Sequence, residues 1–97
     1  MAIVIRWTAT AEDGLDEILA YLEEHDFEVS LKKLLKEIDK KLKRLSDFPE
    51  SGRISHKKGI RLVKVDKNIN MYYFFDGNNI EILDFFDTRQ NPSKRPF

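Results

Sequence analysis

The apolar positions of the chain first alternate and then recur at helical spacing. Within residues 1–8, Ile3, Ile5 and Trp7 fall on one side, which is the pattern of a strand. The following stretch carries one apolar stripe with helical spacing, made of Ala11, Leu15, Ile18, Leu19 and Leu22. This stripe predicts an amphipathic helix. Thr8 or Thr10 is suited to cap its N-terminus.

A second helical stripe follows after a short polar connection. Its members are Leu31, Leu34, Leu35, Ile38, Leu42 and Leu45. We expect residues 25–27 to turn the chain. Pro49 should end the second helix, because residues that precede proline avoid helical backbone angles. Two stripes joined by so short a connection predict an antiparallel helical hairpin.

Three strand-like runs occupy the second half of the chain. They span residues 60–65, 69–75 and 80–86, and a polar loop, residues 49–59, precedes them. Short polar turns separate the runs, and Asp76-Gly77 is a strong hairpin signal. The run 69–75 is almost continuously apolar, which is typical of a strand buried on both faces, so it should lie at the centre of a sheet.

These elements predict one α+β domain spanning residues 1–97, in the order β-α-α-β-β-β. The first strand must join the last three, because a lone strand leaves its backbone groups unpaired. We therefore expect the helical hairpin to pack on one face of a four-stranded, mainly antiparallel sheet. The opposite face should stay partly open, with Arg61, Arg89 and aromatic side chains meeting partners there.

Composition narrows the class of protein. The chain has 97 residues, 35% of them charged, and no cysteine, so disulfides and thiolate sites are excluded. We find neither an apolar stretch long enough to span a bilayer nor a signal-peptide pattern, so a cytoplasmic protein without membrane contact is expected. His25 and His56 are far apart in sequence, and we expect no metal and no cofactor.

Charge is segregated along the chain although its net value is zero. Every charged residue from Glu12 to Glu28 is acidic. Two basic stretches follow; their residues are Lys32, Lys33, Lys36, Lys40, Lys41, Lys43 and Arg44, then Arg53, Lys57, Lys58, Arg61, Lys64 and Lys67. Opposite potentials on different faces can orient a partner, although two helix faces that simply attract each other are as good an interpretation.

The order of elements and several local patterns resemble the RelE/ParE toxin superfamily. The second helix ends in a leucine, proline, glycine and arginine pattern at Leu45, Pro49, Gly52 and Arg53. Ile60-Arg61 opens the next strand, Tyr72-Tyr73 lies in the central one, and residues 87–92 resemble the family's closing arginine segment. The resemblance implies a toxin held inactive by a cognate antitoxin, as a hetero-oligomer with it.

Members of this superfamily act in two ways, and the resemblance leaves both open. RelE-like toxins cut messenger RNA on the ribosome without a metal, whereas ParE-like toxins inhibit DNA gyrase and cleave nothing. Metal-free cleavage needs a base, an acid and cations around the phosphorane. The catalytic candidates here are Arg61, Arg89 and His56. Candidates for RNA or target binding are Arg53, Lys57, Lys58, Lys64, Tyr73 and Lys94.

The structural alternatives for these residues are simple. Arg61 can pair with Asp84 or Asp87, and a lone loop histidine such as His56 is usually just solvated. The aromatic residues near Tyr72 can serve as a core and an antitoxin surface instead of stacking on bases.

Departures from the ribonuclease pattern favour the second mode. RelE-like enzymes usually carry an arginine where this chain has Asn70, and a tyrosine or histidine near the C-terminus, which is missing here. Asp84 and Asp87 would repel phosphate. A ParE-like growth inhibitor with DNA gyrase as its candidate target is thus the first hypothesis. A ribosome-dependent endoribonuclease is the alternative, and a plain interaction domain is a third.

Overall fold

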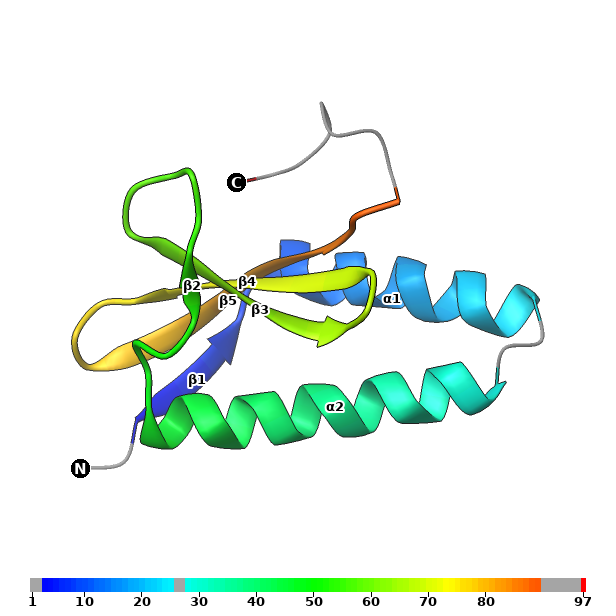
Figure 1. The fold of residues 1–97 in the computed structure, drawn as a ribbon, viewed down its shortest axis with the longest axis horizontal. Coiled ribbons are helices and arrows are strands. Elements are labelled where there is room, and N and C mark those ends of the chain that lie inside the picture. Colours follow the sequence, from blue (N-terminus) through cyan, green and yellow to red (C-terminus); the bar gives the residue numbers. More distant parts are fainter. Residues whose placement is uncertain (1–2, 26–27, 90–96) are drawn as a thin grey trace.

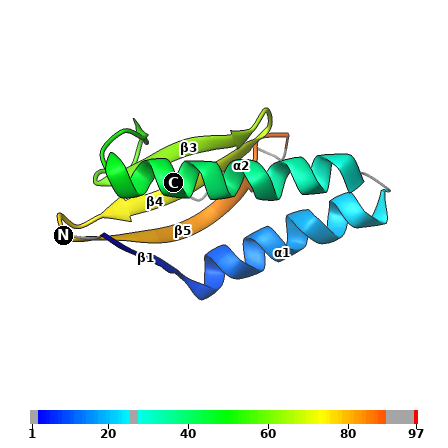
Figure 2. The same cartoon turned by 90° about the horizontal axis from the view of Figure 1, so that it is seen from below.

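A computed structural model describes residues 3–25, 28–89 and 97 of the chain (Figure 1). Two helices, α1 (Ala9–Glu24) and α2 (Glu28–Asp47), follow the first strand, β1 (Val4–Trp7). They run antiparallel, which confirms the predicted hairpin (Figure 2). His25 closes α1 through a backbone hydrogen bond from its N–H to the Tyr21 carbonyl. Asp26 and Phe27, which belong to the predicted turn, lie outside the described residues.

Within the residues that the structure describes, the sheet has five strands, so the predicted count of four is wrong. The additional strand, β2 (Arg53–Ile54), lies inside the stretch that the sequence predicts to be a loop. Two residues are too short for an alternating pattern, and β2 exists because it pairs antiparallel with β3 (Ile60–Asp66). The other strands are β4 (Ile69–Phe75) and β5 (Asn79–Asp87).

The strand order is β1-β5-β4-β3-β2, so β4 is central, as its continuous apolar run predicts. β3, β4 and β5 form an antiparallel meander, and β1 pairs in parallel with the first half of β5. At the β4–β5 turn, Asp76 Oδ1 accepts hydrogen bonds from the Asn78 and Asn79 amides, both at 2.7 Å. Gly77 there adopts φ +98°, as the Asp-Gly signal requires.

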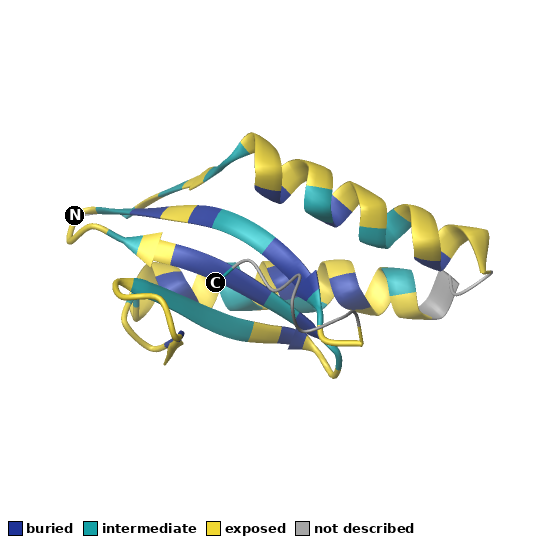
Figure 3. Ribbon diagram, turned by 90° about the horizontal axis from the view of Figure 1, so that it is seen from above, coloured by how far each residue is buried: buried dark blue, intermediate teal, exposed yellow. Residues whose placement is uncertain are grey.

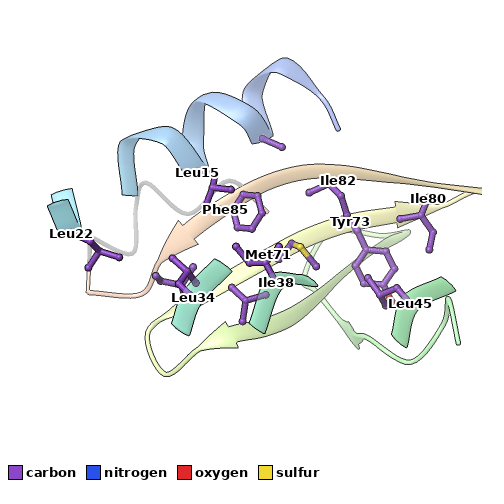
Figure 4. Packing of buried hydrophobic residues seen from close by; sticks show 13 residues of the cluster. Leu15, Leu22, Leu34, Ile38, Leu45, Met71, Tyr73, Ile80, Ile82 and Phe85 are labelled. Carbon is purple, nitrogen blue, oxygen red and sulfur yellow. The ribbon is translucent and has the colours of Figure 1, made fainter. Parts of the chain in front are cut away.

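The core lies between the helical hairpin and one face of the sheet. Figure 2 shows α2 running across that face, whereas α1 runs beside β5 beyond the end of β1. Figure 4 shows the two leucine stripes meeting the strands, with Leu34 and Ile38 facing Met71, and Leu15 beside Phe85. The opposite face of the sheet is seen in Figure 3. The predicted two-layer architecture is therefore confirmed.

Thr8 joins the first helix to the sheet. Its Oγ1 accepts a hydrogen bond from the Ala11 amide at 3.1 Å, which makes it the N-cap of α1. The same hydroxyl lies 3.0 Å from the carbonyl oxygens of Ile82 and Leu83, to which it donates, and the Thr8 amide donates to Ile82 O. One side chain thus caps the helix and attaches its start to β5.

We expect Thr8→Val to lower the free energy of unfolding by about 1–2 kcal/mol, because it keeps the shape of the side chain but removes the cap and its donor. Thr10, the other cap candidate, is exposed, so Thr10→Val should change it by less than about 0.5 kcal/mol. Urea denaturation of both variants measures the difference. Equal effects would show that Thr8 has no special role.

Candidate functional site

The loop that follows α2 is fastened to the sheet by Tyr73. This tyrosine is fully buried among the core residues, and its hydroxyl donates to Pro49 O at 2.8 Å while accepting from the Gly52 amide at 2.9 Å. Only glycine fits at position 52, because a Cβ there would lie 2.6 Å from Tyr73 Cε1. Burial raises the pKa of Tyr73 above its ordinary value, so the hydroxyl stays protonated and keeps donating. The prediction that Tyr73 contacts RNA or a target is wrong, because no part of its side chain reaches the surface.

Arg61 lies on the helix side of the sheet, not on the open side. It pairs with Tyr73 across the β3–β4 ladder, so both side chains leave the same face. Its Nη1 donates to Gly52 O at 2.9 Å. The prediction of an open-face arginine is therefore wrong, and so is the pairing with Asp84 or Asp87. Arg61 instead braces the same loop that Tyr73 holds.

Arg89 follows β5 at the other end of the sheet and is bound to a carboxylate. Its Nη2 lies 2.6 Å from Asp87 Oδ2, its Nε lies 2.9 Å from Oδ1, and its amide also donates to Oδ1. These hydrogen bonds hold the pKa of Asp87 below its ordinary value. Because the guanidinium and the carboxylate neutralise each other, Arg89 presents little net charge to a phosphate.

His56, Lys57 and Lys58 stand in an exposed loop between β2 and β3. Ser55 orders this loop: its buried hydroxyl accepts from the Lys57 amide at 3.0 Å, and its own amide donates to Ile60 O at 2.9 Å. The loop therefore carries its cations in a fixed shape.

The three catalytic candidates do not meet. His56 and Arg61 lie where β3 begins, and Arg61 is level with Tyr73 and Ile82. Asp87, which holds Arg89, pairs with Ile69, four positions before Tyr73 on β4 and roughly 13 Å along the strand. The two guanidinium groups also line different pockets and have different partners, Gly52 O and Asp87, so they do not surround one common phosphate site. The structure thus divides the predicted catalytic set between two ends of the sheet.

The open face carries fewer of the predicted residues. Lys64 is exposed there, across the ladder from Asn70, whose Oδ1 is buried without a hydrogen-bond partner. Tyr72 belongs to this face but is only 1% exposed, and the Phe97 ring lies 5.4 Å from its ring, centroid to centroid. Lys94 lies outside the described residues.

A pocket of about 550 Å³ is lined by residues of α1 and of the second half of β5, and no pattern in the sequence indicates it. Ile18 and Phe85 are among the apolar residues that line it, and Glu17 and Asp84 are among the acidic ones. Burial, with Glu17 nearby, raises the pKa of Asp84, although the Phe85 amide donates to it at 2.8 Å. Gly14 is what lets this carboxylate approach α1, since a Cβ there would collide with Asp84 Oδ1.

The acidic helix α1 and the basic helix α2 are not joined by ion pairs among the described residues. In the described part of the chain, the ion pairs of α2 are Lys40–Glu37 and Lys43–Asp39, both within the helix, and none reaches α1. Among the residues that the structure describes, no three or more histidine, aspartate or glutamate side chains are grouped in a way that suits a metal ion. The basic and acidic surfaces are therefore available to other molecules.

Comparison with known proteins identifies the class. A family model described as the ParE toxin of type II toxin–antitoxin system, parDE, matches residues 5–92. The chain belongs to this family, within the RelE/ParE superfamily, and is a toxin of a type II toxin–antitoxin system. No curated protein matches the chain.

Solved structures agree with this fold. A chain of the chromosomal ParDE TA system from P. aeruginosa is 21% identical, with a TM-score of 0.73, over 89% of this chain and 96% of that one. The YoeB dimer from Staphylococcus aureus is 20% identical with a TM-score of 0.59, covering 87% and 94%. The E. coli DinJ-YafQ toxin–antitoxin complex is 8% identical with a TM-score of 0.63, covering 92% and 96%.

We expect Tyr73→Phe to lower the free energy of unfolding by about 1–3 kcal/mol, because Pro49 O and the Gly52 amide lose their partner. Tyr21→Phe, at a side chain 45% exposed, is the matched control and should have little effect.

The same pair of variants tests the tyrosine's protonation. The folded state holds the Tyr73 proton more tightly than the unfolded chain, whose tyrosines lose theirs near pH 10.0. Wild-type stability should therefore fall as pH rises past that value, through this group, and Tyr73→Phe should lack this part of the loss. Parallel curves for wild type and variant between neutral and strongly alkaline pH would contradict the assignment.

Proposed function

We propose that this toxin inhibits growth by binding a macromolecular target without cleaving it, in the ParE-like mode, with DNA gyrase as the target. The observation that carries the proposal is the separation of the catalytic candidates, with Arg61 committed to Gly52 O and Arg89 to Asp87. A ribonuclease must collect its base, its acid and its cations around one phosphate.

Electrostatics supports the same choice. The Asp87 carboxylate cancels the charge of the guanidinium that would stabilise a phosphorane, and Asp84 and Glu17 add negative charge at that end of β5. A protein target does not need concentrated positive charge, because apolar contacts and hydrogen bonds supply much of an ordinary protein interface.

The partner that restrains the toxin is a cognate antitoxin. The ParDE and DinJ-YafQ structures, to which the chain is similar, are a toxin–antitoxin system and a complex. Among the described residues, no helix is both long and apolar enough to cross a membrane. The cytoplasm, where both a gyrase and a ribosome are found, remains the expected location.

Expression of the toxin should arrest growth of a bacterial host, and the purified protein should block supercoiling by DNA gyrase. Primer extension on ribosome-bound messenger RNA should reveal no new 5′ ends. Full supercoiling in the presence of excess toxin would end the gyrase assignment. New 5′ ends that disappear with Arg61→Ala, in a variant that remains folded, would establish the ribonuclease instead.

Growth inhibition should survive Arg89→Gln, because the wild-type guanidinium is already engaged by Asp87 and is not required for chemistry. Asp87→Asn is the matched variant, since it releases Arg89 from the ion pair without removing it. Growth curves after induction, with circular dichroism to confirm folding, measure both. Loss of inhibition in a folded Arg89→Gln protein would identify Arg89 as a direct contact to the target.

A further inference from the structure

A second concave site lies where β3 begins and β4 ends. It is a pocket of about 430 Å³, and its apolar lining comes from Ile54, Ile60, Phe74 and Phe75. Ile54 is 70% exposed and Phe74 is 39% exposed. Large apolar side chains gathered at an exposed pocket, rather than scattered singly, are typical of protein interaction sites.

The charged lining of this site, which we call the β2–β3 pocket, is mostly basic. Lys58 and Arg61 line it, with Glu50 as the one acid among its lining residues. Arg61 uses Nη1 to hold Gly52 O, so its other guanidinium N–H groups can serve a ligand. His56 and Lys57 stand in the same exposed loop, which projects away from α2 (Figure 1). The site therefore combines an apolar floor with cations.

The walls of the β2–β3 pocket are held in place before anything binds. Ser55 is buried and hydrogen-bonds across the loop, and Ile60 donates its amide to Lys57 O at 3.1 Å. Gly59 adopts φ +85°, a backbone conformation that other residues rarely adopt, so glycine at this position lets the loop turn beside the Phe74 ring. A site ordered in this way loses little conformational entropy when a ligand binds.

We propose that the β2–β3 pocket binds an acidic segment of the cognate antitoxin that carries a large apolar side chain. The proposal rests on the proposed function, since it assumes the toxin has an antitoxin. Charge complementarity selects an acidic partner, and the apolar floor selects a protein segment. A nucleic acid fits less well, because Ile54, which is more exposed than Phe74, offers no aromatic face for stacking, whereas a large apolar side chain can pack on both.

The chemistry of the ligand can be tested with labelled probes and fluorescence anisotropy on the purified toxin. The first probe is a short peptide of alternating glutamate with leucine or phenylalanine. A second replaces glutamate with lysine, a third replaces the apolar residues with serine, and a fourth is a single-stranded RNA. We expect the first to bind most tightly, and more weakly as salt rises. Equal or tighter binding of the basic peptide, the serine peptide or the RNA would overturn the proposal.

Variants locate the binding. Ile54→Ser and Lys58→Glu should each lower the affinity of the toxin for the acidic probe by about tenfold or more, and tenfold corresponds to about 1.4 kcal/mol of binding free energy. The matched controls on α2, Leu35→Ser and Lys33→Glu, change an apolar residue 43% exposed and an exposed lysine outside the pocket, and should leave affinity unchanged. Affinity unaffected by the two pocket variants would place the peptide elsewhere and refute the assignment.

A growth assay separates an antitoxin site from a target site. The antitoxin is taken as the adjoining open reading frame whose co-expression restores growth. Ile54→Ser should still arrest growth but should be rescued less by that antitoxin than wild type. A variant that is rescued normally, or one that loses toxicity while still binding the antitoxin, would overturn the proposal. If the wild-type protein is not toxic at all, the proposed function fails, whereas the probe experiments still decide the chemistry of the pocket.

Discussion

The hydroxyl group of Tyr73 is the contact on which the arrangement of the basic end of the sheet, which carries Arg61 and the β2–β3 loop, depends. It lies at the junction of α2, the central strand and the loop that leads to β2, and it satisfies two backbone groups of that loop at once. Because a buried backbone group without a partner costs about 1–3 kcal/mol, the loop has no equally good position elsewhere. Gly52 packs closely against the tyrosine ring, and in this position its carbonyl accepts a hydrogen bond from Arg61. The short strand β2 begins at the next residue, so its pairing with β3 inherits the same constraint.

This constraint changes what the cations of the chain can do. An arginine that holds a backbone carbonyl on the helix side of a sheet is a structural residue first, although part of its guanidinium still faces outward. At the opposite end of the sheet, the ion pair with Asp87 likewise occupies the guanidinium of Arg89. Two arginines that look catalytic in the sequence are thus already engaged, one by a backbone carbonyl and the other by a neighbouring carboxylate, and the exposed Lys57 and Lys58 of the β2–β3 loop add positive charge beside Arg61.

The layers of the fold could be predicted because they follow from periodicity. The leucine stripes of both helices and the apolar run of β4 each carry a signal repeated over many residues. The site could not be predicted in the same way. Which face Arg61 occupies depends on its register with Tyr73, and register is a property of two strands together, not of either pattern alone. Tyr73 stands in an apolar run, and nothing in that run indicates that its hydroxyl has hydrogen-bond partners. Only the pattern of Pro49 and Gly52, known from the family resemblance, indicated that the loop is important.

Two pockets of the surface carry opposite charge, and this limits how an antitoxin can neutralise the toxin. Glu17 and Asp84 line the pocket between α1 and the second half of β5, whereas Lys58 and Arg61 line the one at the β2–β3 loop, which no residue of β5 lines. Because the net charge is zero, such a molecule is steered by its charge separation rather than by its total charge. An acidic partner bound at the basic end leaves the acidic pocket uncovered. It can therefore silence the toxin only if it extends along the sheet and covers the other pocket as well. Such a partner requires a segment whose charge changes from acidic to basic along its length.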